Sequence, residues 1–215
     1  KRNRNPPPHA LHIMPRIIEL FPTPLFESGI TPREEWVRFA VDEPYGRSPE
    51  DPNSISCDKN VLDLLPDLKE EITNACKVYA HEYLGVMEHN DVYISRSWCV
   101  KHKKGDWAGL HAHINSIWSG IYYLKCDDRS GSVVFEKGWN YNNCFTSTLQ
   151  PDHFQNHLNQ DAFSFTPVDG TLLIFPSQLQ HRVLRSESDS LRYCIAFDVF
   201  ISGKTGYNGG NGIEL

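Results

Sequence analysis

The segment from residue 90 to residue 202 consists of short apolar runs separated by turn residues, and it lacks helical periodicity. Apolar residues that alternate with polar ones are typical of strands with one buried face, and frequent turns join such strands into antiparallel sheets. The pattern therefore favours a β-sandwich or jelly roll. The expected strands cover residues 108–115, 116–125, 131–136, 143–149, 161–166, 170–175, 181–185 and 191–201.

The N-terminal part of the chain predicts helices that cover this β-rich core. Apolar residues recur every three or four positions over 66–84, which predicts an amphipathic helix ended by Gly85. Thr31 and Pro32 resemble the cap and first turn of a shorter helix. We expect an edge strand in the apolar stretch 17–26, and a loop over 42–58 because prolines are frequent there.

With 215 residues, of which 40% are hydrophobic, the chain suits one domain with additions. We expect a tail or linker over 1–15, a single domain over 16–202 with its β-core at about 90–202, and a flexible tail over 203–215. The formal net charge of −6 argues against a duplex-DNA binder. No apolar run reaches the roughly 18 residues of a membrane span. The expected fold class is thus mostly β with flanking α-helices.

Six cysteines are widely spaced and contain no C-x-x-C pair, which predicts reduced, mostly buried thiols in a cytoplasmic protein. Ten histidines are many for this length, and their positions are more informative than the cysteines. His111 and His113 are two residues apart in an expected strand, so both side chains would point to the same face. His181 follows an apolar strand and a short loop, and the charged Arg192 stands in another apolar strand. From spacing alone, these remain either ligands or ordinary surface and core residues.

Five motifs in this order resemble the Fe(II)/2-oxoglutarate-dependent dioxygenase superfamily, most closely an uncharacterised bacterial and phage branch related to prolyl hydroxylases. The opening Leu20-Phe21-Pro22-Thr23-Pro24-Leu25 also resembles that branch, so the resemblance covers about residues 16–202. The resemblance implies a double-stranded β-helix, a cupin-like jelly roll. The motifs are His111-Ala-His113, Ser119-Gly-Ile-Tyr-Tyr-Leu124, Gly131-Ser132 with Phe135, Gly170-Thr-Leu-Leu-Ile-Phe-Pro176 with His181 and Val183, and Arg192-Tyr-Cys-Ile-Ala-Phe197.

The resemblance also implies an iron site, in which His111 and His181 take the positions of the two family histidines. The family usually has a carboxylate at the middle position, where this chain has His113. Three possibilities remain: His113 is the third ligand, Asp106 or another carboxylate takes its place, or the site is degenerate and inactive. We favour His113 as the ligand.

For the co-substrate, the resemblance implies that Arg192 binds the distal carboxylate of 2-oxoglutarate and that Tyr123 adds a hydrogen bond. Fe(II), 2-oxoglutarate and O₂ would together hydroxylate a protein, peptide or small polar substrate, with formation of succinate and CO₂. Two alternatives are another cupin-like metal enzyme and a non-enzymatic jelly-roll binding or virion module. A bacterial or phage-infected cytoplasm is the expected location, and a homodimer is left open.

Three further segments carry weaker expectations. Residues 138–160 form a long polar insertion suited to a lid, and His153 and His157 within it are spaced for a second metal site. His102 lies among lysines and is expected in a solvated turn.

Overall fold

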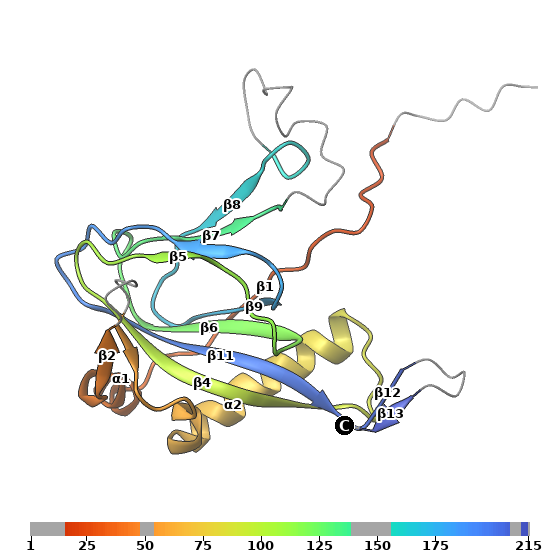
Figure 1. Cartoon of the computed structure of the whole chain (residues 1–215), viewed down its shortest axis with the longest axis horizontal. Coiled ribbons are helices and arrows are strands. Elements are labelled where there is room, and N and C mark those ends of the chain that lie inside the picture. The colour runs from red at the N-terminus through yellow and green to blue at the C-terminus, as the bar shows by residue number, and fades with distance from the viewer. Residues whose placement is uncertain (1–15, 48–53, 139–155, 207–211, 215) are drawn as a thin grey trace, which may run out of the picture.

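Two antiparallel sheets face each other in a computed structural model, which describes residues 16–47, 54–138, 156–206 and 212–214 (Figure 1). The larger sheet has the order β1 (Phe26–Gly29), β9 (Thr171–Pro176), β6 (Trp118–Lys125), β11 (Arg192–Ser202), β4 (Asp91–His102), β3 (Ser54–Ser56) and β2 (Tyr45–Arg47). The smaller sheet has the order β5 (Ala108–His111), β10 (His181–Val183), β7 (Val133–Glu136) and β8 (Ala162–Phe165). The predicted jelly roll is confirmed. The expected tail 1–15, strand 143–149, His153 and most of the expected lid lie outside the described residues.

The inner faces of the two sheets form one core, and the alternation along β6 shows how it is built. Ile121 and Tyr123 point between the sheets, whereas the hydroxyl of Tyr122 donates to the backbone carbonyl of Ile30 on the other side, at 3.1 Å. At Gly120 a Cβ atom would lie 2.1 Å from the ring of Phe197. Only glycine therefore lets β6 and β11 pack this closely at that point.

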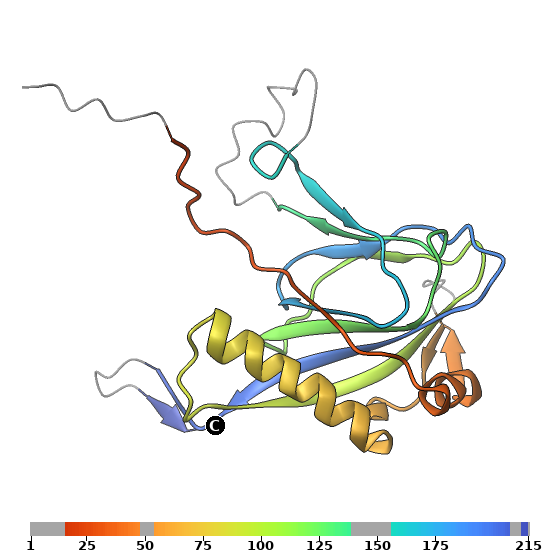
Figure 2. The ribbon, with the colours of Figure 1, turned by 180° about the vertical axis from the view of Figure 1, so that it is seen from behind.

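The outer face of the larger sheet is covered by helical segments (Figure 2). These are α1 (Glu34–Asp42), a 3₁₀ turn (Val61–Leu64), α2 (Pro66–Lys77) and a π-helical turn (Val78–Tyr83) that continues α2. Leu68 and Ile72 on one stripe of α2 are fully buried, and Tyr79 packs edge-on against Trp118 of β6 at 5.7 Å between ring centroids. The apolar residues that recur every three or four positions over 66–84 therefore form the face by which the predicted helix packs against the sheet.

Several predicted boundaries were wrong in this N-terminal part. Residues 17–21 form no strand and the large apolar side chains among them are exposed; β1 begins only at Phe26. Helix α1 begins at Glu34, because Arg33 keeps an extended backbone while its guanidinium pairs with Asp67 and Glu71 at 3.0 and 2.8 Å.

Two expected irregular segments contain short strands. Within 42–58, β2 and β3 pair and extend the larger sheet next to β4. Beyond residue 203, β12 (Lys204–Thr205) and β13 (Ile213–Glu214) form a separate antiparallel pair. Short strands of two or three residues leave too little alternation to be detected in a sequence. Within the described ranges, none of the helices is both long enough and apolar enough to cross a bilayer.

Candidate active site

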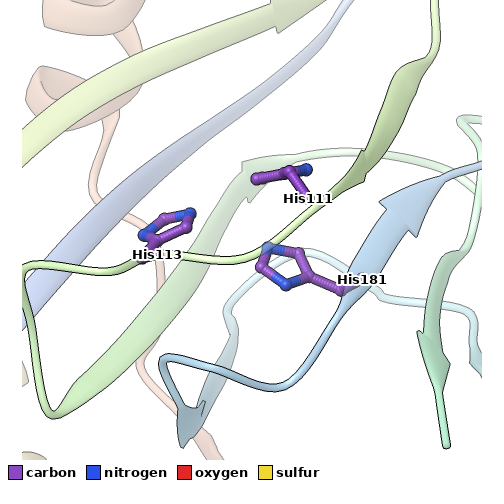
Figure 3. A group of neighbouring side chains, drawn as sticks. All are labelled: His111, His113 and His181. Carbon is purple, nitrogen blue, oxygen red and sulfur yellow. The ribbon is translucent and has the colours of Figure 1, made fainter. Parts of the chain in front are cut away.

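Three histidines meet between the two sheets (Figure 3). His111 is the last residue of β5, His181 is the first residue of β10, and these two residues are direct partners across the antiparallel pair. The ring centroids of His111 and His181 are 4.3 Å apart, and His113 lies 5.4 Å from each. One nitrogen from each ring lies within 4.8 Å of the others, so all three can reach one metal ion.

The way His113 reaches this group differs from the expected strand. We expected 108–115 to be one strand, but β5 ends at His111. The chain then leaves the sheet, and the backbone amide of His113 donates to the carbonyl of Ser177 at 2.8 Å. This bond to the loop after β9 returns the His113 ring to the same space as His111. We expected the two histidines to share a site. The reason given for it, that both side chains point to one face of a single strand, was wrong because His113 lies outside β5.

Each histidine has an acceptor at its Nδ1 atom. Nδ1 of His111 lies 2.8 Å from the carbonyl oxygen of Gly109, and Nδ1 of His181 lies 2.9 Å from that of Leu179. Nδ1 of His113 lies 2.5 Å from the carboxylate of Asp198. Because the acceptors place the proton on Nδ1, the Nε2 lone pairs are available to a metal.

The environment of His181 keeps this ring neutral. Burial, followed by the nearby His111, lowers the pKa of His181 from 6.5 to about 4. A neutral imidazole is the form that binds a metal ion.

Asp198 was missed by the sequence reasoning. It is fully buried in the apolar strand β11, where it accepts hydrogen bonds from His113, from Ser119 at 3.0 Å and from Arg96 at 2.5 Å. Burial alone would raise the pKa of Asp198, but the bonds from His113 and Arg96 outweigh burial and lower it. The available signal was an acid in an apolar strand, the same argument that singled out Arg192.

Asp106, the alternative ligand, is not part of the histidine group. Its carboxylate accepts a hydrogen bond from the backbone amide of Lys103 at 3.1 Å, in a turn that ends β4. Across the described ranges, the cluster of candidate metal ligands comprises His111, His113 and His181 and no carboxylate.

A pocket of about 710 Å³ extends from the histidines along β11. Arg192, Cys194 and Ala196 alternate along this strand and all line the pocket, because residues two apart share a face. His102 of β4 also lines it and is the direct register partner of Arg192. No Asp or Glu of the described residues lines this pocket. It can therefore accept an anion.

Arg192 is a buried cation at the end of this pocket. Its guanidinium donates to the carbonyl of Gly131 at 2.9 Å and packs over the ring of Tyr123 at 5.0 Å. Gly131 has a φ of +88°, and a Cβ there would lie 2.3 Å from the carbonyl oxygen of Leu184, so glycine is required where it holds Arg192. Nε of Arg192 and the hydroxyl of Tyr123 are buried without a hydrogen-bond partner in the described part of the protein.

His102 was wrongly expected in a solvated turn. Strand β4 continues through it, and the side chain is 1% exposed, with neither ring nitrogen hydrogen-bonded within the described structure. Burial, then the charge of Arg192, lowers the pKa of His102 from 6.5 to about 3. The burial of His102 was not predicted, because the lysines around it suggested a surface turn.

This low pKa predicts a pH dependence of stability. Unfolded chains take up a proton at His102 near pH 6.5 but the native state does not until about pH 3, so acidification below 6.5 favours unfolding. His102 alone should contribute a loss of about 2 kcal/mol between pH 7 and pH 5. Urea unfolding of the metal-free protein measures this loss. In His102→Leu the loss should be smaller by that amount, whereas the exposed His157→Leu should behave like the wild type; equal slopes for all three proteins would contradict the prediction.

Residues 96–198, which contain all the histidines of the cluster and Arg192, match the family model "Putative 2OG-Fe(II) oxygenase". No curated protein matches the sequence.

Solved structures share the fold. HygX from Streptomyces hygroscopicus, with nickel and 2-oxoglutarate bound, has 11% identity and a TM-score of 0.56, over 83% of each chain. The non-heme α-ketoglutarate-dependent epimerase SnoN of nogalamycin biosynthesis has 10% identity and a TM-score of 0.59, over 88% of this chain and 83% of its own. A prolyl-4-hydroxylase from Pseudomonas putida has 14% identity and a TM-score of 0.50, over 82% of this chain and 92% of its own.

These structural likenesses agree with the predicted double-stranded β-helix, and the family model covers the histidine cluster and the buried arginine. Over residues 96–198 the chain is similar to the 2-oxoglutarate- and Fe(II)-dependent oxygenases.

Proposed function

We propose that this protein is an Fe(II)- and 2-oxoglutarate-dependent oxygenase that hydroxylates a protein, peptide or small polar substrate. One observation carries the proposal: three oriented imidazoles and a buried arginine, which has no acidic partner among the described residues, lie in the same pocket. When bound, iron with O₂ supplies the oxidising chemistry that couples hydroxylation to conversion of 2-oxoglutarate into succinate and CO₂. Every other task belongs to the residues of the chain.

His111, His113 and His181 would hold the iron through Nε2. Their Nδ1 protons are bound to acceptors, which sets the tautomer and orients each ring before metal arrives. Three protein ligands would leave other coordination positions of the metal for the co-substrate and O₂.

Arg192 would bind the distal carboxylate of 2-oxoglutarate. A buried cation without an acidic partner is costly, and a bidentate carboxylate removes that cost. The unpartnered hydroxyl of Tyr123 and a ring N–H of His102 lie beside it and can donate to the same carboxylate. Among the described residues, Arg192 Nε and the two neighbouring groups lack hydrogen-bond partners, which fits a dicarboxylic acid better than a neutral ligand.

The substrate would lie at the mouth of the pocket. Trp107, Leu110 and Ile114 line the pocket and remain 38%, 50% and 84% exposed, so an apolar surface adjoins the metal cluster. Such a surface suits a peptide or a small molecule with apolar parts. The cytoplasmic location and the homodimer stay predictions from the sequence.

The non-enzymatic alternative needs the histidines to be incidental, and their shared pocket speaks against it. The cupin-like alternative differs from the proposed function in one respect. A cupin-like metal enzyme that does not use 2-oxoglutarate would not need Arg192 to bind a distal carboxylate.

The decisive experiment is an anaerobic titration of the protein with Fe(II) and then 2-oxoglutarate. We expect a weak visible charge-transfer band that requires both, and succinate formation once O₂ is admitted. A matched titration with succinate in place of 2-oxoglutarate should give no band, because succinate lacks the 2-oxo group. A folded protein that shows neither band nor succinate would overturn the proposal.

A further inference from the structure

The three-histidine cluster raises a question of charge. Each of the three side chains is an imidazole, so the cluster offers a divalent cation no negative charge from an atom that would touch it. A carboxylate ligand would normally provide one. Within the described residues, the acidic group bonded to any of these histidines is Asp198, behind His113.

Asp198 is held firmly in this position. Its side chain is 0% exposed, and Oδ1 accepts from Nδ1 of His113 at 2.5 Å and from the hydroxyl of Ser119 at 3.0 Å. The hydroxyl oxygens of Ser119 and Ser177 are 2.9 Å apart. The backbone carbonyl of Ser177 accepts the hydrogen bond from the backbone amide of His113. The same few residues therefore fix both the ring and the backbone of His113.

Arg96 acts on the opposite side of Asp198. Its guanidinium donates to Oδ2 at 3.1 and 2.5 Å, and its side chain is 52% exposed at the pocket. The negative charge of Asp198 is thus divided between a histidine that faces the cluster and an arginine that faces solvent.

We propose that Asp198 is the positioning residue that supplies, through His113, the negative charge that the metal site lacks at its third ligand. A carboxylate that accepts the Nδ1 proton of a ligating histidine increases the basicity of Nε2 and fixes the ring. The inference rests on the proposed function for the identity of the metal. The carboxylate would then lie one hydrogen bond away from the metal instead of binding it.

Two variants separate this role from a purely structural one. Asp198→Asn keeps an acceptor of similar shape and removes the charge, whereas Arg96→Gln keeps the charge and frees it from its counter-ion. Both variants break the Arg96–Asp198 ion pair. If the pair only stabilised the fold, both should weaken metal binding. If Asp198 supplies charge, the two should shift affinity in opposite directions.

The measurement is Co(II) affinity, followed by titration of the visible Co(II) absorption, with circular dichroism as a check on folding. Co(II) is a redox-stable probe, so no turnover is needed. We expect Asp198→Asn to bind about 10- to 100-fold more weakly, the range typical for losing a group that orients a ligand. Arg96→Gln should bind several-fold more tightly than the wild type.

Lys59→Gln is the matched control, because Lys59 also lines the pocket and donates to the carbonyl of Ser56 rather than to Asp198. It should change the affinity less than Arg96→Gln does. Unchanged affinity in Asp198→Asn, weaker binding in Arg96→Gln or an equal gain in Lys59→Gln would each overturn the inference. If Asp198→Asn fails to fold, Arg96→Gln and Lys59→Gln still decide. A wild type that binds no Co(II) would instead count against the proposed function.

Discussion

Replacement of His181 by alanine should abolish metal-dependent turnover. His181 begins β10 and is buried against Phe175, with its Nδ1 atom bonded to the carbonyl of Leu179. The ring cannot be replaced by a neighbour, because the other two histidines already occupy their own positions in the cluster. Two ligands alone hold divalent iron weakly, so we expect a larger loss than the roughly 10- to 100-fold caused by removing a group that orients a ligand.

Two assays check this prediction: succinate formation at saturating 2-oxoglutarate, and Co(II) affinity of the same preparation. His157→Ala is the control, since His157 is exposed and pairs with Glu19. The control should keep wild-type metal affinity and turnover. Turnover in a folded His181→Ala protein within threefold of the wild type would exclude the three-histidine site.

Replacement of Arg192 by methionine should raise the KM for 2-oxoglutarate with a much smaller effect on Co(II) affinity. Methionine fills most of the arginine volume, and it cannot donate to a carboxylate. Truncating one partner of a buried charge pair costs about 2–5 kcal/mol, so kcat/KM for 2-oxoglutarate should fall by roughly 30- to several-thousand-fold.

The stability of the ligand-free protein gives a second readout for Arg192→Met. The arginine is 2% exposed and has no acidic partner among the described residues, so its removal relieves a buried charge. The free energy of unfolding should therefore stay equal or rise. Arg182→Met is the control, because Arg182 pairs with Glu136 outside the pocket and should not affect the co-substrate. Unchanged 2-oxoglutarate affinity in Arg192→Met would favour the cupin-like alternative.

The strands of the jelly roll were largely predictable because β6, β9 and β11 are long enough to show their burial pattern. The short elements were not. Strands β2 and β3 have three residues each, and they form because β4 offers a free edge next to them. Such strands depend on a partner strand that is distant in the sequence. The local pattern of apolar and polar residues does not indicate that partner.

In the candidate site, too, some residues could be predicted from the sequence and others could not. His111, His113 and His181 were chosen because their residue type and order resemble a known family, and the structure places them together. His102 and Asp198 were missed, since their chemistry depends on burial. A histidine among lysines is solvated or buried according to where its strand runs, and here β4 carries it into the pocket.

The sequence by itself determined the β-rich class and the covering helix over 66–84, because local periodicity is a property of neighbouring positions. It singled out the three histidines and Arg192 as candidates through their resemblance to a known family. Only the tertiary structure decided that His113 reaches the cluster from outside a strand, that His102 is buried beside Arg192, and that Asp198 lies behind His113. The first feature arises from a hydrogen bond to the loop after β9, and the other two from pairing across β4, β6 and β11. In both cases solvent exclusion and hydrogen bonding are set by residues that are distant in the sequence.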